Sequence, residues 1–564
     1  MEGSAVNLSG ADILMKSLEK EGVEVVFGYP GGTVLFLYDA LLEANFRHIM
    51  TRHEQAAAHA ADAYARATGR VGVCLATSGP GATNLVTGIA TAHMDSIPMV
   101  ALTGQVNKDL IGRDAFQEAD TCGMTIPFAK HSFLVREAGD IPAVIQEAFH
   151  LARSGRPGPV VVDLPKDITA DTAPFIYPER LSARAQRTAN KCAPQPRAQD
   201  IARLADALHK AKRPVLYVGG GVIAAGACAS LRQLAEKTQI PVTTTLMGIG
   251  CFPGDHPLSL GMLGMHGTRY ANQAVTQSDL LLAIGVRFDD RVTGRCADFA
   301  PNATIVHIDI DPAEISKNVH ADLAIISDAR QALAALLPLV DSGEHGEWLA
   351  QVMAWKEMHP LTYEQGRMQI KPQQVCAQLN ELAAANSIVT TDVGQHQMWT
   401  AQYCQFDAPR RFLTSGGLGT MGYGLPAAIG AQIACPDRQV IAILGDGGFQ
   451  MTMQELGTMV KYQLPVKIVL LNNQYLGMVR QWQELFLEKR YSAVEMDANP
   501  DFIQLAGAYG IPARRVEDPQ ELVECLAWCL HQPGPAFLEV KIAKEENVFP
   551  MVPAGKALHE MLGY

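Results

Sequence analysis

The sequence lacks several features that mark particular classes of protein. Its eleven cysteines include no CxxC pair or other metal-like spacing, so we expect reduced, mostly buried thiols and a cytoplasmic protein. No apolar run approaches the roughly 20 residues that cross a bilayer. Residues 1–20 show no basic region followed by an apolar one, so we expect no signal peptide and no membrane span. A formal net charge of −12 disfavours nucleic acid as the main partner.

The composition fits a globular chain of several domains, with 564 residues, of which 48% are hydrophobic and 18% charged. One pattern occurs three times: a turn of small residues, a helical stretch, an aliphatic residue with proline, and an apolar run. The prolines are Pro98, Pro241 and Pro465. Because proline cannot continue a helix, each marks the start of a strand. The repeated βαβ unit predicts three doubly wound parallel-sheet α/β domains.

Two polar stretches divide the chain. Residues 183–200 carry prolines and few apolar side chains, and residues 338–374 show no clear strand. We therefore expect domains at residues 1–185, 190–345 and 370–564. In doubly wound sheets ligands bind at the carboxyl ends of the strands, where the small-residue turns of this chain lie.

The segment GDGGFQMTMQELGTMVKYQLPVKIVLLNN, residues 445–473, carries the clearest candidate site. Asp446 and Asn473 offer oxygen ligands, which Mg²⁺ takes, often together with substrate phosphates. The N–H groups of Gly447 and Gly448 would open a helix, where anions are favoured. No GKS or GKT follows, which excludes a P-loop. The segment predicts a metal-bound diphosphate, and the alternative is an ordinary βαβ turn with a surface aspartate.

Two further stretches have both a functional and a structural interpretation. Glu54 opens an alanine-rich helix after an expected strand at residues 46–50. It is either a carboxylate that favours the helix dipole or, if buried, a candidate for proton transfer. The glycines around Met421, in residues 417–431, indicate either close helix packing or contact with a cofactor.

The middle of the chain resembles a dinucleotide site. Three glycines at residues 219–221 follow an apolar run, and charged residues follow two more runs, within residues 281–294 and 305–315. Such strand ends can hold ribose or phosphate groups, although a lone glycine cluster is weak support. Arg287 and Arg291 either face phosphate or form a solvated surface pair.

Nine motifs occur in one order along the chain: RHEQAAAHAADAYAR, TSGPGATN, DAFQEAD, GRPGPVVVDLPKD, LGMHGT, RFDDRVTG, VGQHQMW, GLGTMGYGLPAAIGA and GDGGFQM…LNN. Through them nearly the whole chain resembles the acetohydroxyacid synthase (acetolactate synthase) catalytic subunits, a family of thiamine diphosphate (ThDP) enzymes. The resemblance implies a pyrimidine-binding domain, a central FAD-binding domain and a diphosphate-binding domain. It also implies a homodimer or a dimer of dimers, with each active site between the first domain of one subunit and the third of another. Many members have a separate small regulatory subunit.

The resemblance also implies roles for residues at matching positions. Glu54 would hydrogen-bond the pyrimidine of ThDP and promote deprotonation of its reactive carbon, while Met421 would hold the cofactor bent. Further ThDP contacts are implied at Val393, Gln395, His396, Gly419, Gly447 and Gly448, and Mg²⁺ ligands at Asp446, Asn473 and the carbonyl of Tyr475. Residues implied around the reacting centre are Gly32, Gln117, Met478 and Trp482, and those lining the access channel are Phe116, Lys166 and Arg291. FAD contacts are implied at Arg156, Gly219, Gly220, Gly221, Thr245, Leu246, Met265, His266, Gly285, Arg287, Arg291, Asp309 and Asp328.

The reaction implied by the resemblance is a carboligation. Pyruvate is decarboxylated on ThDP, and the hydroxyethyl carbanion, shielded from protons, attacks a second 2-keto acid. Pyruvate as acceptor gives 2-acetolactate and 2-ketobutyrate gives 2-aceto-2-hydroxybutyrate, in the biosynthesis of valine, leucine and isoleucine. An aromatic wall at Trp482 would favour the longer 2-ketobutyrate. FAD has no electron to transfer in this reaction, so its role would be structural.

The chain departs from the family pattern at Phe36, Asn107 and Lys108, all expected near the channel mouth, where they bear on substrate range and inhibitor response. A ThDP-dependent 2-keto-acid decarboxylase and the catabolic acetolactate synthase are disfavoured because they do without flavin. Glyoxylate carboligase is disfavoured because it lacks a carboxylate at the position of Glu54. A pyruvate oxidase that reduces its flavin and a noncatalytic dinucleotide-binding protein are the remaining alternatives.

Overall fold

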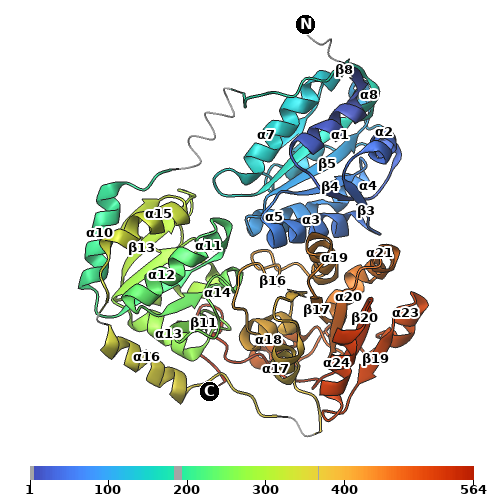
Figure 1. The fold of residues 1–564 in the computed structure, drawn as a ribbon. Helices are drawn as coiled ribbons and strands as arrows, with labels where there is room; N and C mark the ends of the chain where they lie inside the picture. The colour runs from blue at the N-terminus through green and yellow to red at the C-terminus, as the bar shows by residue number, and fades with distance from the viewer. Residues whose placement is uncertain (1–5, 183–193, 344, 366–367, 564) are drawn as a thin grey trace.

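The computed structural model describes residues 6–182, 194–343, 345–365 and 368–563. These residues form three six-stranded parallel sheets with their covering helices (Figure 1) and one antiparallel pair, β1 (Asn7–Ser9) with β8 (Thr172–Pro174). The predicted α/β class with three doubly wound sheets is therefore confirmed. The expected linker at 183–200 lies largely outside the described residues, and the domain boundaries stay predictions. No helix in the described part of the chain has the length and apolar character to cross a bilayer.

The first and third sheets share one strand order. The first runs β3 (Arg47–Met50), β2 (Val25–Gly28), β4 (Gly72–Ala76), β5 (Met99–Gln105), β7 (Pro159–Pro165) and β6 (His131–Leu134). The third runs β16 (Phe412–Leu413), β15 (Ile388–Thr391), β17 (Val440–Gly445), β18 (Lys467–Asn472), β20 (Ala536–Lys541) and β19 (Ala513–Val516). The order reverses between β2 and β4 in one sheet and between β15 and β17 in the other. Ligands bind doubly wound sheets at such switch points.

The middle sheet has a different order, that of the dinucleotide-binding doubly wound fold. It runs β11 (Ser259–Met262), β10 (Val242–Thr244), β9 (Pro214–Val218), β12 (Leu280–Ile284), β13 (Thr304–Asp309) and β14 (Leu323–Ile326). Counted within the domain, this order is 3-2-1-4-5-6, with its switch point between β9 and β12. The flanking helices are α10 (Ala198–Lys210), α13 (Arg269–Gln277), α15 (Ala329–Leu336) and α16 (Gly346–Met358). In Figure 1 this domain lies at the left, coloured green to yellow.

The strands of the three repeated units lie where they are predicted, but their helices differ from the prediction. β5, β10 and β18 begin one or two residues after Pro98, Pro241 and Pro465. Each expected helix is split in two: α4 (Pro80–Asn84) and α5 (Val86–Met94), α11 (Gly220–Ala224) and α12 (Cys228–Thr238), α20 (Asp446–Thr452) and α21 (Leu456–Lys461). In the second unit Gly226, at φ +63°, interrupts the helix, because this left-handed conformation cannot continue it.

The first and third domains pack through two helices rich in small residues. They are α3 (Glu54–Thr68) and α19 (Gly424–Ala434), which lie next to each other in Figure 1 and share one apolar core. A Cβ at Gly430 would stand 2.1 Å from the carbonyl oxygen of Ala60, so only glycine permits this approach. The alanine-rich helix at Glu54 is therefore an interdomain helix.

Two segments beyond the middle sheet pack against it. Trp348 in α16 donates to the carbonyl of Pro214 at 3.0 Å, and the amide of Val552 donates to the carbonyl of Met265 at 2.7 Å. Both side chains belong to the core beneath the middle sheet. The end of the chain thus returns from the third domain to the middle one, beside residues implied in FAD binding.

Buried histidines contribute to the pH dependence of stability of the ligand-free protein. Burial lowers the pKa of His59 to about 3 and the pKa values of His266 and His396 to about 4. In the unfolded chain they titrate near pKa 6.5. Each of them contributes stability that is present above pH 6.5 and is lost as the pH falls towards about 4, by roughly 1.4 kcal/mol per pH unit near pH 5. Buried carboxyl groups with raised pKa values, such as Asp163 and Glu455 at about 7, oppose this loss in the same pH range.

We expect this loss in urea unfolding curves measured between pH 7 and 4.5. The free energy of unfolding of His59→Gln should rise less steeply with pH than that of the wild type, by roughly 1.4 kcal/mol per pH unit near pH 5, because one group that binds a proton on unfolding is removed. His559→Gln, at an exposed histidine, is the matched control and should leave the curve unchanged. An unaltered slope in His59→Gln would contradict this explanation.

Candidate active site

Asp446 is a buried carboxylate at the switch point of the third sheet. It follows β17 and begins α20, its side chain is 1% exposed, and its Oδ2 accepts a hydrogen bond from Asn499 Nδ2 at 2.7 Å. Burial raises the pKa of Asp446 to about 6, opposed by the hydrogen bond from Asn499. A buried carboxylate with no cationic side chain bonded to it suits a cation as its missing partner. Asn499 was not among the predicted residues.

Asn473 follows the neighbouring strand, β18, and lines the same cavity as Asp446 and Tyr475. Its Oδ1 accepts from the amide of Tyr475 at 3.1 Å and its Nδ2 donates to Gln395 Oε1 at 3.3 Å. The cavity has a volume of about 80 Å³. One carboxylate, one amide and a backbone carbonyl are hard oxygen donors of the kind Mg²⁺ takes. In the described ranges no group of three or more His, Cys, Asp or Glu is placed to hold a metal ion.

The remaining walls of this cavity suit a diphosphate. His396, at the start of α18 (Gln395–Tyr403), has a buried Nε2 with no hydrogen-bond partner, and burial keeps its ring neutral by lowering its pKa to about 4. A Cβ at Gly447 would stand 2.6 Å from Leu476 and 3.7 Å from Met421. The structure brings together at this cavity the predicted residues Val393, Gln395, His396, Met421, Asp446, Gly447, Gly448, Asn473, Tyr475 and Met478.

Asp392 organises the loop that carries Met421. It is fully buried after β15, and its carboxylate accepts from the amides of Gly422 and Gly424 at 3.0 Å. A Cβ at Gly448 would stand 2.2 Å from Asp392 Oδ1, so this glycine is also required by internal packing. The sequence prediction missed Asp392, although an acidic residue at the end of an apolar run was a visible signal. Gly419, in the same loop, has φ +70°.

Glu54 is not among the residues that line this cavity. It begins α3 and is 9% exposed, and its Oε2 accepts from Asn84 Nδ2 at 2.9 Å. Asn84 is the last residue of the TSGPGATN motif and was not singled out from the sequence. No first-domain residue lines the Asp446 cavity in the described part of the chain. The described residues that line the cavity belong to the third domain, whereas Glu54 belongs to the first.

The other predicted first-domain residues surround the loop after β5. Gln117 has φ +59°, and a Cβ at Gly79 would stand 2.7 Å from its carbonyl oxygen. Phe116 is 88% exposed, and Gly32 is exposed at the start of a 3₁₀ turn after β2. Phe116 and Gly32 are therefore exposed, whereas Gln117 is half-buried.

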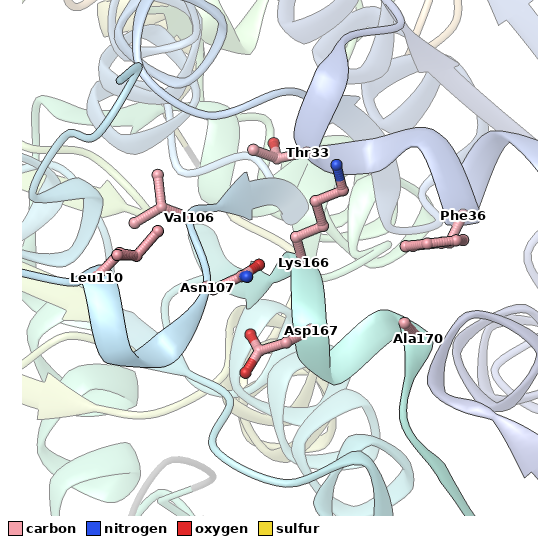
Figure 2. Close-up of a pocket in the computed structure, with 8 residues that line it drawn as sticks. All are labelled: Thr33, Phe36, Val106, Asn107, Leu110, Lys166, Asp167 and Ala170. Carbon is pink, nitrogen blue, oxygen red and sulfur yellow. The ribbon is translucent and has the colours of Figure 1, made fainter. Parts of the chain in front are cut away.

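A second, open cavity of about 370 Å³ lies at the carboxyl edge of the first sheet (Figure 2). It is lined by Thr33, Phe36, Val106, Asn107, Leu110, Lys166, Asp167 and Ala170. Figure 2 shows the Lys166 side chain reaching towards Thr33, with Phe36 and Asn107 on either side. Lys108 does not line it but approaches Asp167 at 4.0 Å. Phe36 and Asn107, where the chain departs from the family pattern, thus lie together with the predicted channel residue Lys166.

Arg291 lies elsewhere, at the junction of the middle and third domains. Its guanidinium stands 5.9 Å from the ring centroid of Trp482, a cation–π distance. Trp482 lies on α22 (Gly477–Phe486) and is half-buried, four residues after Met478. Two residues predicted for different parts of the site, the channel and the acceptor side, are therefore in contact.

The residues implied in FAD binding follow the carboxyl ends of all six middle strands. Gly221 and Gly285 pack so closely that a Cβ at either would stand 2.6 Å from the other's Cα, and Gly285 has φ +59°. Burial raises the pKa of Asp309 to about 6. Arg156 reaches in from the first domain and pairs with Glu314 at 2.6 Å. The others at these strand ends are Gly219, Gly220, Thr245, Leu246, Met265, His266, Arg287 and Asp328.

Asp328 also has a purely structural contact. It caps α15, its Oδ1 accepting from the amides of Arg330 at 3.0 Å and Gln331 at 3.2 Å. Helix capping accounts for an aspartate there without any ligand. The strand order, rather than any single residue, is the stronger sign of a dinucleotide site.

Comparison with known proteins bears on the whole chain. Three family models match it: the N-terminal TPP binding domain of thiamine pyrophosphate enzymes at residues 8–124, their central domain at 201–336, and their C-terminal TPP binding domain at 392–540. The acetolactate synthase large subunit of Parasynechococcus marenigrum is 51% identical over 99% of this chain and 91% of its own. The acetolactate synthase isozyme 3 large subunit of Escherichia coli is 50% identical over 98% of both chains. That of Buchnera aphidicola is 49% identical over 98% of both.

Proposed function

The chain belongs to the thiamine pyrophosphate enzymes, among the acetolactate synthase large subunits, and from this premise we propose its substrates and products. It decarboxylates pyruvate and joins the remaining two-carbon unit to pyruvate or 2-ketobutyrate. The products are 2-acetolactate and 2-aceto-2-hydroxybutyrate, for branched-chain amino acid biosynthesis. ThDP, when bound, supplies the electron sink for decarboxylation. The observation that carries the proposal is the cavity that joins buried Asp446, Asn473 and the unpaired Nε2 of His396.

The third domain holds the diphosphate end of the cofactor in this proposal. Asp446, Asn473 and the carbonyl of Tyr475 would hold Mg²⁺, whose charge would offset that of the phosphates. Gln395, His396 and the amides of Gly447 and Gly448 bind the phosphate oxygens. Asp392 fixes the loop of Met421 and Gly419, so that the Met421 side chain meets the cofactor in a set position.

The first domain of a second subunit completes the site. Glu54 is buried and oriented by Asn84, which suits a carboxylate that holds a proton at the pyrimidine nitrogen. Because the described residues that line the Asp446 cavity belong to the third domain and Glu54 belongs to the first, we propose a homodimer, or a dimer of dimers, with two chains contributing to each site. The exposed Phe116 would then be covered by the partner, and Gln117 and Gly32 would lie beside the reacting centre.

The acceptor 2-keto acid meets Met478 and Trp482. Arg291 stacks on Trp482, which holds the ring in place and puts a cation near the incoming carboxylate. Lys166 offers a second cation at the open cavity of Figure 2, where substrates enter. The middle domain binds FAD without redox turnover, supported by its strand order.

Two proposals concern partners and compartment. The relatives are named large subunits, and on that ground we propose a small regulatory subunit as partner. We propose the cytoplasm because all ten cysteines in the described ranges are free thiols.

An anaerobic assay tests the proposed reaction. Purified protein with ThDP, Mg²⁺ and FAD is given pyruvate while flavin absorbance is followed, and acetolactate is converted to acetoin by acid and measured. We expect acetolactate to accumulate with the flavin still oxidised. Prompt bleaching with formation of acetate would instead establish a pyruvate oxidase. Adding 2-ketobutyrate then gives the acceptor preference.

A further inference from the structure

The turn that precedes Glu54 is held by the third domain of the same chain. The amide of Arg52 donates to both carboxylate oxygens of Glu455, at 2.9 and 3.1 Å, and the amide of Met50 donates to Tyr462 Oη at 2.8 Å. The Arg52 guanidinium also donates to the carbonyl of Gly457 at 3.3 Å. The backbone from the end of β3 to the start of α3 is therefore fixed from outside its own domain.

Glu455 is built into this contact. Its side chain is fully buried, and besides the amide of Arg52 it accepts a hydrogen bond from Thr458 Oγ1 at 2.6 Å. Hydrogen bonds from N–H groups to a buried carboxylate are strong and leave little freedom in either partner. Glu455 ends a 3₁₀ turn, Met453–Glu455, that continues directly from α20. The anchor thus belongs to the segment that begins at Asp446.

We propose that Glu455 is a positioning residue for Glu54. Glu54 stands two residues after Arg52, at the first position of α3, so a displacement of the Arg52 backbone moves the Glu54 carboxylate directly. A misplacement of about 1 Å in a reacting group can cost about 10²-fold in rate. The inference rests on the proposed function of Glu54, and concerns how that carboxylate is held rather than what it does.

Steady-state kinetics of three variants test this inference. Glu455→Ala should lower kcat about 10- to 100-fold with little change in KM for pyruvate, because alignment and not substrate binding is lost. Glu455→Gln should recover most of kcat, since its amide oxygen still accepts from the Arg52 amide. Thr458→Val is the matched control: it removes one hydrogen bond to the same carboxylate but leaves the Arg52 contact, and should keep wild-type kcat.

A double-mutant cycle separates positioning from general destabilisation. In a Glu54→Gln background, adding Glu455→Ala should cost nothing further, because the group being positioned is already gone. The inference would be overturned if the loss of kcat in the double variant equalled the product of the two single losses, or if Glu455→Ala kept wild-type kcat. Near-normal turnover of Glu54→Gln alone would instead overturn the proposed role of Glu54.

Tyr462→Phe keeps the test decisive if Glu455→Ala does not fold. It removes the hydroxyl that accepts from the Met50 amide and donates to the carbonyl of His48 at 3.5 Å, and should lower kcat by about 3- to 10-fold, again without effect in the Glu54→Gln background. Two results together would overturn the inference: wild-type kcat in Tyr462→Phe, and a larger loss of kcat in Glu455→Gln than in Thr458→Val. They would show that the Glu455 carboxylate affects turnover by a route other than the position of Glu54.

Discussion

Turnover of Glu54→Gln is expected to fall by about 10²- to 10⁴-fold, the range typical of removing a general acid–base group. The amide keeps the volume of the side chain, and its oxygen can still accept from Asn84, so the fold should be unchanged. What it cannot do is hold a negative charge beside the pyrimidine nitrogen. Initial rates of acetolactate formation at saturating ThDP measure the effect.

Glu24→Gln is a suitable control for this prediction. Glu24 lies in the same domain, is exposed, accepts a hydrogen bond from Tyr64 Oη at 3.0 Å, and does not line the Asp446 cavity. We expect its kcat to match the wild type. If Glu54→Gln turned over at a similar rate to Glu24→Gln, the assignment of Glu54 as the proton-transfer residue would be wrong.

The second large effect is expected for Asp446→Asn, as a weakening of ThDP binding by about 100-fold or more. The variant keeps the shape of the side chain and loses the single anionic oxygen donor among the three proposed ligands. Calorimetric titration with ThDP at fixed Mg²⁺ gives the affinity. Removing a buried charge should leave the ligand-free protein at least as stable as the wild type, and ThDP with Mg²⁺ should no longer raise its melting temperature.

Two comparisons sharpen the Asp446 prediction. Asn499→Ala removes the side chain that bonds Asp446, and should weaken binding by about 10- to 100-fold, as outer-shell partners do. Asp497→Asn changes an exposed carboxylate nearby and should have no effect. Wild-type ThDP affinity in Asp446→Asn would rule out this residue as the metal ligand.

The candidate site was predictable where its residues follow strands directly. Asp446, Asn473 and His396 each come within one to five residues of a strand's carboxyl end, and parallel strands bring such ends to one edge of the sheet. The glycines and prolines that interrupt the apolar runs located these strand ends in all three domains. The breaks within the crossover helices were not predicted, since only Gly226 gave a local signal for one of them.

What the sequence by itself determined is therefore local: three parallel sheets, their strand ends, and the polar residues placed there. Only the tertiary structure decided which side chains contact and position residues of another domain. Glu455 meets the backbone of Arg52 across 403 positions of chain, and Asp95 accepts from the amides of Gly416 and Gly417 at 3.0 and 2.7 Å. Such contacts depend on how α3 packs against α19, which requires glycine at Gly430 and small side chains along both helices. Because Glu455 and Asp95 each resemble any other buried acidic residue in their local sequence, nothing near them in the sequence indicates these contacts.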